Sequence, residues 1–331
     1  MKLLLEGIPH YGIFPNEISE VNYKDYEYVN PLGNKIGNFK KHFAYNQFQY
    51  LGAVSEKLIF GVAIADLKYI TNAFLYLYFP ETKKLYSKSF KNPFSVGSNF
   101  TNHPEVGATS FQSGNKKISM SIQNQIKLLE VSIPNELNMK INFDEAKIQP
   151  LRICTKAGVN GWVYARKTAG ARVTGTIQSM LGDFNLAEMN LLGHNDFSMG
   201  FMRPETFWNW SLFMGEVDKN IFSVNLSAGV NETEFSENCC WMNGQLFPLP
   251  QVSFHYDKKN LMKPWTVKSN KEDVRLEFIP EGLYQEKINA YILASNFNQV
   301  YGKYSGQILL NGKIIDVKNF YGYAEDHYAK W

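Results

Sequence analysis

The chain has 331 residues and a formal net charge of +3, with 44% hydrophobic and 20% charged residues. These values describe an ordinary globular protein of about two domains and exclude a largely disordered chain. Basic and acidic residues, 34 and 31 in number, are mixed along the sequence. Nucleic-acid binding needs a strongly basic face, so no nucleic-acid partner is expected. Aromatic residues reach 15%, which fits either a β-rich core or an aromatic-lined ligand cavity.

The sequence predicts a cytoplasmic protein. Residues 3–5 are leucines, but Glu6 follows them directly, so this apolar stretch is far shorter than the core of a signal peptide. No run approaches the ~20 apolar residues of a transmembrane helix, and peripheral membrane contact stays open. The three cysteines, Cys154, Cys239 and Cys240, form no disulfide framework and suit a reducing compartment. The oligomeric state is not predicted.

Strand signals dominate the chain after an irregular beginning. Residues 1–35 are rich in Tyr, Asn, Pro and Gly without a clear period and are predicted to lie over a barrel. Residues 43–79 carry dense β-branched and aromatic signals, and the segment 74–79 is apolar on both faces, as expected where a sheet is buried on both sides or lies between domains. Apolar and polar residues alternate in 118–122 and 274–278, which indicates half-buried strands.

Turn and helix signals agree with an all-β fold. Asn-Gly pairs at 160–161, 243–244 and 311–312 predict two-residue type I′ hairpin turns, because Asn and Gly tolerate the positive φ angles of this turn. Amphipathic helix patterns are scarce. The two candidates, within 176–192 and around 285–295, match the helical period poorly.

One pattern occurs twice in the chain. The matching segments are 59–65 (IFGVAIA) with 221–227 (IFSVNLS), 163–166 (VYAR) with 300–303 (VYGK), and 193–196 (GHND) with 322–327 (GYAEDH). Three matches in the same order predict an internal duplication of a β unit. We expect antiparallel β domains at 1–200 and 201–331, the first with longer loops between Phe90 and Pro150.

Polar residues gather at the two repeat ends. His194 and Asp196 lie in the first, and Asp326 and His327 lie in the second. A histidine beside a carboxylate can act as a general acid/base pair. These acids can instead close each β unit by binding backbone amides or Arg203. The six histidines never occur at short ligand spacing, so neither a metal site nor a cofactor is predicted.

Further candidates follow Arg203. Trp208 and Trp210 are two residues apart and face the same side of a strand, where they can form the floor of a cavity or plug a barrel end. Asn225, Glu237 and Asn238 are polar residues in apolar, strand-like surroundings. A carboxylate that points into a barrel needs a partner or acquires a raised pKa. Glu237 is therefore the leading acid/base or ligand-anchoring candidate, unless it faces solvent on the outer wall.

These segments resemble the DUF2804 family, a bacterial family of unknown function. The resemblance rests on five parts of the chain: 208–210, 225–226, 237–238, 193–200 and 322–331. That family is similar to lipocalin-like proteins that include carotenoid hydratases and AttH. The resemblance implies two lipocalin-like antiparallel β-barrels related by duplication, with a cavity in or between them. Some of these relatives guide cyclisation of polyenes, and others add water to an isoprenoid double bond.

The repeat ends depart from the pattern of those enzymes, which reads Gly-x-Gly/Tyr-x-Asp/Glu-His-x-Trp-Gly. Residues 193–200 lack the His after the acid and the Trp before the final Gly. Residues 322–331 keep Glu325, Asp326, His327 and Trp331 at altered spacing. The departures bear on the chemistry more than on the fold, because a fold does not fix a function.

Three functions fit the sequence. The first is a carrier that binds a hydrophobic small molecule, such as a lipid, isoprenoid or polyketide, on Trp208 and Trp210, with Arg203, Asn225 and Glu237 orienting a polar head. The second is a hydratase or cyclase in which Glu237 or the Asp326–His327 pair protonates an alkene. The third is an interaction module whose cavities are filled by the protein's own side chains.

Overall fold

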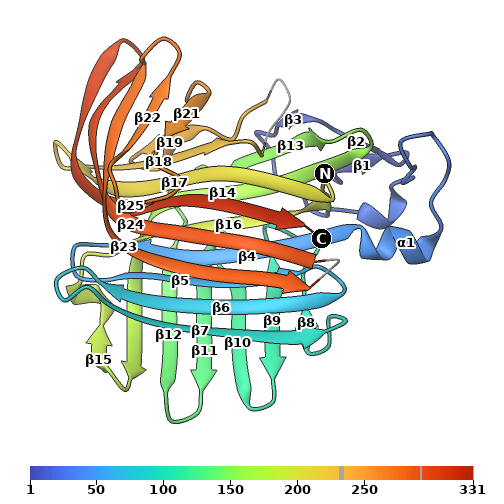
Figure 1. Ribbon diagram of the computed structural model, residues 1–331, viewed down its shortest axis with the longest axis horizontal. Helices are drawn as coiled ribbons and strands as arrows, with labels where there is room; N and C mark the ends of the chain where they lie inside the picture. The colour runs from blue at the N-terminus through green and yellow to red at the C-terminus, as the bar shows by residue number, and fades with distance from the viewer. Residues whose placement is uncertain (231–234, 291–292, 331) are drawn as a thin grey trace.

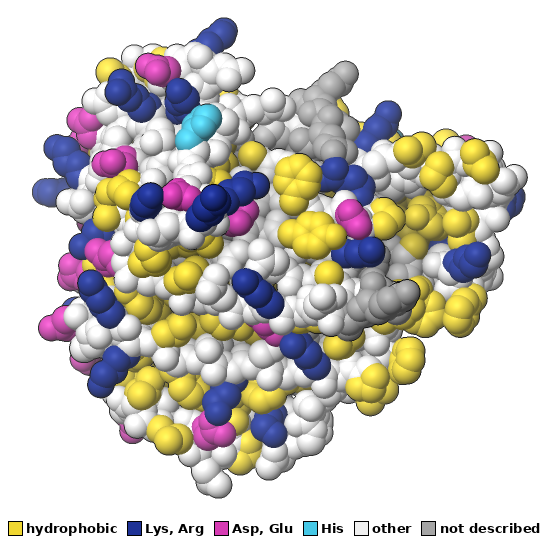
Figure 2. Space-filling view, in the orientation of Figure 1, with side chains coloured by type: hydrophobic (Ala, Val, Ile, Leu, Met, Phe, Trp, Pro, Cys, Tyr) yellow, Lys and Arg dark blue, Asp and Glu magenta, His cyan; other side chains and the backbone are white. Residues whose placement is uncertain are grey.

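The computed structural model describes residues 1–230, 235–290 and 293–330. It consists of two large antiparallel sheets, each curled into a half-barrel, with very little helix (Figure 1). This arrangement confirms the all-β fold that the sequence predicts. Charged side chains of both signs are interspersed on the face shown in Figure 2. No helix within the described ranges is long and apolar enough to cross a membrane.

The first sheet follows the strand order β7-β6-β5-β4-β16-β14-β12-β11-β10-β9-β8, with β3, β13 and β15 paired at its side. Its strands are β3 (Gly12–Ile13), β4 (Tyr45–Val54), β5 (Ile59–Asp66), β6 (Ile70–Phe79), β7 (Lys84–Pro93), β8 (Ser98–Asn99), β9 (Gly107–Ser113), β10 (Lys116–Gln123), β11 (Ile126–Ile133), β12 (Leu137–Asp144), β13 (Leu151–Ala157), β14 (Gly161–Ser179), β15 (Gly182–Asn185) and β16 (Leu192–Phe201).

The second sheet follows the order β20-β19-β18-β17-β25-β24-β23-β22-β21. Its strands are β17 (Glu205–Val217), β18 (Asn220–Ala228), β19 (Cys239–Met242), β20 (Gln245–Pro248), β21 (Val252–His255), β22 (Trp265–Ser269), β23 (Val274–Ala290), β24 (Leu293–Leu310) and β25 (Lys313–Lys330). The first sheet ends along the chain with β16 and the second begins with β17, so the change of sheet falls at residues 202–204.

The two sheets share one topology. Strands β4 to β7 of the first occupy the same positions in the order as β17 to β20 of the second, and β16, β14 and β12 correspond to β25, β24 and β23. The three repeated sequence segments lie in β5 and β18, in β14 and β24, and in β16 and β25. Each pair of matching segments therefore occupies equivalent strands, as expected of a duplicated unit.

Three of the four hydrophobic cores of the described residues lie within or between the two large sheets. One fills the first half-barrel, one fills the second, and a third lies between the two sheets. Strand β6 contributes to two of them: Leu75 and Leu77 face the first half-barrel, whereas Phe74, Tyr76 and Tyr78 face the second sheet. This position between the sheets explains why residues 74–79 are apolar on both faces.

Two of the three predicted hairpin turns form. Asn243 and Gly244 adopt φ of 48° and 83°, and Asn311 and Gly312 adopt 49° and 78°, as a type I′ turn requires. The third prediction is wrong, because residues 158–160 form the turn and β14 already begins at Gly161. Gly161 instead permits close backbone packing, since a Cβ atom there would collide with the Phe201 carbonyl oxygen.

The remaining expectations concern smaller segments. The beginning of the chain carries β1 (Leu4–Leu5), β2 (Ile8–Pro9) and η1 (Tyr23–Asp25), and it packs on a fourth core beside the first sheet. The helices are α1 (Asn38–Phe43) and η2 (Leu186–Glu188).

Neither weak helix candidate forms a long helix. Residues 176–190 fall mainly in β14, β15 and η2. Residues 285–290 and 293–295 belong to β23 and β24, and residues 291–292 lie outside the described ranges. The extra length predicted between Phe90 and Pro150 is built mostly of strands β8 to β12, not of loops. The Asn and Gly residues there mark the tight turns between strands, at positive φ in Gly114, Asn124 and Asn135.

Candidate functional site

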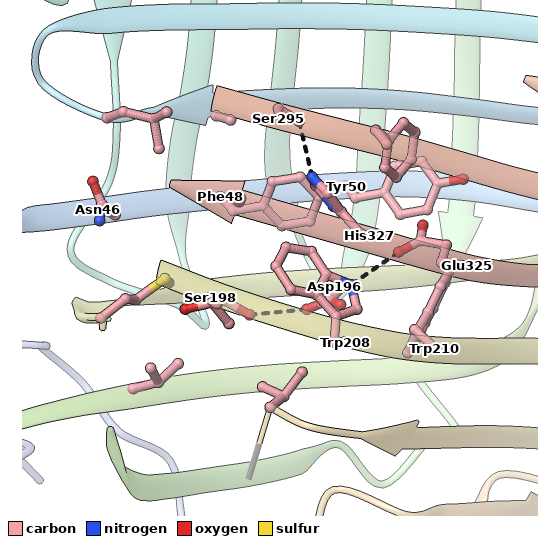
Figure 3. A pocket seen from close by; sticks show the side chains of 18 of the residues that line it. Asn46, Phe48, Tyr50, Asp196, Ser198, Trp208, Trp210, Ser295, Glu325 and His327 are labelled. Carbon is pink, nitrogen blue, oxygen red and sulfur yellow. Dashed lines mark hydrogen bonds between the residues drawn. The ribbon is translucent and has the colours of Figure 1, made fainter. Parts of the chain in front are cut away.

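A cavity of about 230 Å³ lies between the two sheets. Strands β4, β6, β13, β14 and β16 of the first sheet form one side, and β17, β24 and β25 of the second form the other. Its wall is mainly apolar, with aromatic rings from Phe48, Phe74, Trp208, Trp210 and Phe297. Figure 3 shows the side chains of Phe48, Trp208 and His327 close to one another in this space.

Two equivalent rows of residues face each other across the cavity. In the first sheet, backbone pairing aligns Tyr50, Asp196 and Lys167 across β4, β16 and β14. In the second sheet, it aligns Trp210, Glu325 and Gln299 across β17, β25 and β24. All six line the cavity. The duplication thus places a carboxylate at the same position in both sheets, but with a lysine beside one and a glutamine beside the other.

In the first row the carboxylate belongs to an ion cluster. The Lys167 ammonium lies 2.8 Å from Asp196 Oδ2 and 3.1 Å from Glu237 Oε1, and all three side chains are largely buried. Burial alone would lower the pKa of Lys167, but the two carboxylates raise it above its ordinary value. The Ser198 hydroxyl also donates to Asp196 Oδ1, at 3.1 Å. This wall of the cavity thus brings one basic and two acidic side chains together.

In the second row the carboxylate has neutral partners. Glu325 Oε2 accepts a hydrogen bond from the Trp208 indole at 3.1 Å, and Oε1 accepts one from the Gln299 amide at 2.7 Å. Among the residues that the structure describes, no lysine or arginine forms an ion pair with Glu325. Burial raises the pKa of Glu325 to about 7. This carboxyl group can therefore hold or release a proton near neutral pH.

His327 belongs to the aromatic wall of the cavity. Its Nε2 lies 3.0 Å from the Ser295 hydroxyl oxygen. Its ring is packed between Trp208 and Phe297, with ring centroids 4.1 Å and 4.9 Å away. Burial lowers the pKa of His327 to about 3, so the imidazole is neutral at physiological pH. Figure 3 shows His327 and Glu325 on the same side of β25, as two-residue spacing in a strand requires.

Six of the residues selected from the sequence line the cavity. They are Asp196, Arg203, Trp208, Trp210, Glu237 and His327. Glu237 faces the interior, not solvent, and it is bound to the Lys167 ammonium. Arg203 lies at the cavity wall and donates to the Gly229 carbonyl oxygen at 2.8 Å.

Asp326 and His194 have positions outside the cavity wall. Asp326 is the neighbour of His327 in a strand, so the two side chains point to opposite faces and form no acid/base pair. Asp326 Oδ1 accepts a hydrogen bond from the Tyr256 hydroxyl at 2.6 Å. The fully buried His194 joins the two sheets, because its Nε2 lies 2.8 Å from the Tyr323 hydroxyl.

Asn225 and Asn238 also lie outside the cavity wall, where they bind neighbouring protein groups. Asn225 accepts from the Trp210 indole at 2.8 Å and donates to the Glu237 carbonyl oxygen at 2.9 Å. Asn238 accepts from the Ser227 amide at 2.7 Å and donates to the Pro250 carbonyl oxygen at 3.1 Å. Both asparagines therefore fix the segment 237–238, which precedes β19, against β18 and its surroundings, and neither lines the cavity.

The sequence interpretation did not select Lys167 and Glu325 for the site. Each had a weak signal. Lys167 alternates with Ala165 and Ala169, so the three side chains share one face of a strand. Small apolar neighbours on this face indicate that it is buried and that Lys167 points inward. Glu325 alternates with His327, so a strand places both on one face.

Comparison with known proteins gives a family and a fold. A family model described as domain of unknown function (DUF2804) matches residues 8–331. A comparison with curated proteins finds no match. The crystal structure of CghA with Sch210972 is similar over 99% of this chain and 96% of that chain, with a TM-score of 0.61 and 10% identity.

Two further solved structures are similar to a lower degree. A putative AttH from Nitrosomonas europaea matches with a TM-score of 0.45 and 11% identity, over 86% of this chain and 91% of that chain. Kievitone hydratase from Nectria haematococca matches with a TM-score of 0.45 and 9% identity, over 86% and 88%. At these identities the likeness concerns the fold alone.

Proposed function

The chain belongs to the DUF2804 family, and we propose that it binds a hydrophobic small molecule in the cavity between its two sheets. The observation that carries the proposal is the composition of this cavity: a mainly apolar wall with aromatic rings also carries buried polar groups, among them Lys167, Glu237 and Glu325. Such a combination is typical of small-molecule sites, where apolar area supplies affinity and polar groups fix orientation. The compartment we propose is the cytoplasm, where its three free cysteines would stay reduced.

The size and chemistry of the cavity define the ligand class. A volume of about 230 Å³ is below the ~300 Å³ at which drug-sized pockets begin. The cavity therefore takes a compact ligand, or one end of a longer lipid, isoprenoid or polyketide whose remainder leaves through the mouth. CghA, which shares the fold, has been crystallised with Sch210972, and this supports a small-molecule ligand.

The polar groups favour a ligand with a hydrogen-bond acceptor at its buried end. At a pH below its pKa of about 7, the protonated Glu325 carboxyl group can donate a hydrogen bond to a carbonyl or hydroxyl oxygen of the ligand. Lys167 is held by two carboxylates, so an anionic head would meet a wall of net negative charge. We therefore propose a neutral oxygen-bearing head at Glu325, with Trp208 and Trp210 against the apolar body.

A fluorescence titration tests this proposal. Long-chain alcohols, ketones and isoprenoids should change the emission of wild-type protein saturably. Trp208→Phe should reduce this response, because Trp208 lines the cavity. Trp265→Phe, which changes a tryptophan in the core of the second half-barrel, should retain it. Flat titrations across all three ligand classes would overturn the proposal.

The second candidate function is a hydratase or cyclase, and the state of Glu325 favours it. A neutral carboxylic acid beside an apolar cavity can give its proton to an alkene carbon, leaving a carbocation and a carboxylate. Water then adds to the cation, or a second double bond closes a ring, and the proton lost in that step returns to the carboxylate. Glu237 suits this role less well than the sequence predicts, because its carboxyl group is already held in an ion pair by Lys167.

Matched substitutions separate the two functions. Glu325→Gln should lower the turnover rate of an alkene substrate by at least about a hundredfold, because general acid catalysis contributes about that much to the rate. Ligand binding should persist in this variant. Glu237→Gln should retain turnover. Product formation that persists in Glu325→Gln would remove this candidate and leave the binding function.

A further inference from the structure

Several residues that line the cavity lie at strand ends on the side of the molecule that carries helix α1 (Figure 1). Thr206 at the start of β17, Asn46 at the start of β4 and Lys330 at the end of β25 all line the cavity, and these strand ends lie together on the side of α1 (Figure 1). Leu67 and Ile70, on either side of the β5–β6 turn, also line it. We therefore place the mouth of the cavity at these strand ends, beside α1.

Exposed apolar side chains cluster at this end. Leu32 and Phe39 are 85% and 77% exposed, and Phe94 is 68% exposed. Phe39 contacts Phe43, whose ring stacks on Tyr69 with centroids 4.3 Å apart. The Phe94 amide donates to the Tyr69 carbonyl oxygen at 2.9 Å, so the cluster continues to the β7–β8 turn. We name these five residues the apolar tip.

Three lysines lie in the segment of the chain that carries Leu32, Phe39 and Phe43 of the apolar tip. Residues 28–55 contain Lys35, Lys40 and Lys41 and no aspartate or glutamate. Lys35 forms an exposed ion pair with Glu27 at 2.6 Å, and Lys41 donates to the Lys24 carbonyl oxygen at 2.6 Å. Figure 2 shows hydrophobic side chains gathered near Lys and Arg side chains at the α1 end.

We propose that the apolar tip docks on an anionic lipid bilayer. Aromatic and aliphatic side chains that enter the bilayer interface favour membrane binding, because their apolar surface is removed from water. Each nearby lysine adds about 1 kcal/mol to the binding free energy on an anionic surface. With few inserted side chains and three lysines, docking is weak and reversible. This inference rests on the proposed function and deepens it: the bilayer is the source from which a hydrophobic ligand reaches the cavity mouth.

Vesicle co-sedimentation of the full chain tests this inference. We expect binding to phosphatidylcholine vesicles that contain phosphatidylglycerol, weaker binding to phosphatidylcholine alone, and a decrease with added salt. Phe39→Asp should abolish the binding. Lys40→Glu combined with Lys41→Glu should lower it by at least about fivefold for each lysine lost.

The matched control is Met180→Asp. Met180 is 75% exposed but follows β14 at the end opposite to the cavity mouth, so this variant should bind vesicles as the wild type does. Equal binding by Phe39→Asp and wild type would overturn the inference, as would absence of binding to both vesicle types. A doubled mass in light scattering that Phe39→Asp halves would also overturn it, because a second copy of the chain would then cover the tip.

This test is independent of the proposed function. Ligand titrations of Phe39→Asp in solution should match those of the wild type, because Phe39 lies outside the cavity wall. Loss of vesicle docking with intact ligand binding would therefore leave the proposed function standing and would localise the membrane surface to the apolar tip.

Discussion

Glu325 is the residue whose environment most constrains the chemistry of this protein. Its position is equivalent to that of Asp196 in the other sheet, yet Gln299 stands where Asp196 has Lys167. A buried carboxylate without a cation costs free energy in its charged form. Retaining an acid at such a position destabilises the fold above neutral pH, which is typical of groups kept for function.

This cost predicts a pH-dependent difference between wild type and Glu325→Gln. The folded pKa of about 7 exceeds the ordinary 4.5, so the folded state binds the proton more tightly. Wild-type stability therefore falls as pH rises from about 4.5 to 7, whereas Gln does not titrate. From pH 4.5 to 8, the free energy of unfolding of Glu325→Gln should rise by about 3 kcal/mol relative to wild type.

Denaturant unfolding at several pH values measures this difference. The exposed Glu130→Gln serves as the matched control, and its difference from wild type should show no comparable rise. A constant difference between Glu325→Gln and wild type across this range would mean that folding does not raise the pKa of Glu325, which would then be no proton donor near neutral pH.

At the residue scale, the sequence predicted the type of site better than its members. Trp208, Trp210 and Glu237 reach the cavity as polar or aromatic residues in apolar strands were expected to. The pairing of Glu237 with Lys167, 70 residues earlier in the chain, depends on how two sheets pack and has no local signal. The adjacent pair Asp326–His327 fails because neighbouring strand residues point to opposite faces.

Gly52 in β4 allows the two sheets to approach each other closely. A Cβ atom at this position would lie 2.5 Å from His194 Nε2 and 3.0 Å from the Tyr323 hydroxyl. These two groups form the hydrogen bond between the sheets. The glycine therefore provides the space in which His194 meets Tyr323.

Gly52→Ala should lower the free energy of unfolding by about 1–3 kcal/mol, the usual cost of overpacking a core. Gly37→Ala, where no atom lies within 4 Å of the added Cβ, should change it by less than about 0.5 kcal/mol. Adding His194→Ala to Gly52→Ala should cost less than His194→Ala costs in the wild type. If the two changes in the free energy of unfolding were strictly additive, the Cβ atom added at residue 52 would not press on the His194 side chain.

At the element scale, alternation and turn chemistry predicted several strands, including those within 43–79, 118–122 and 274–278, but not the number of strands. The Asn-Gly turns at 243–244 and 311–312 succeed because positive φ is a local property. The turn prediction at 160–161 fails because Gly161 is required by close packing against β16, which is a tertiary effect. Between Phe90 and Pro150 only the strand at 118–122 was predicted, within β10; the neighbouring strands were expected as loops, since their many turn residues conceal short hairpins.

At the scale of the whole molecule, the duplication predicted the architecture, and the site arises where the two copies meet. We propose residues 1–200 and 201–331 as the two units. Each half-barrel is filled by its own hydrophobic core, and the cavity lies between the sheets. Divergence of the two copies then gives one row with a fixed ion pair and one with a protonatable acid, which a single unit could not present together.

Native mass spectrometry tests the central claim, that the cavity between the sheets binds a hydrophobic small molecule. Wild type, Ala165→Trp and Ala187→Trp would each be incubated with one mixture of lipids, isoprenoids and polyketides. Ala165 lines the cavity and is 4% exposed, so its replacement fills the space; Ala187 is exposed. We predict one bound ligand in wild type and Ala187→Trp and none in Ala165→Trp. No bound ligand in wild type, or equal binding by Ala165→Trp, would contradict the account.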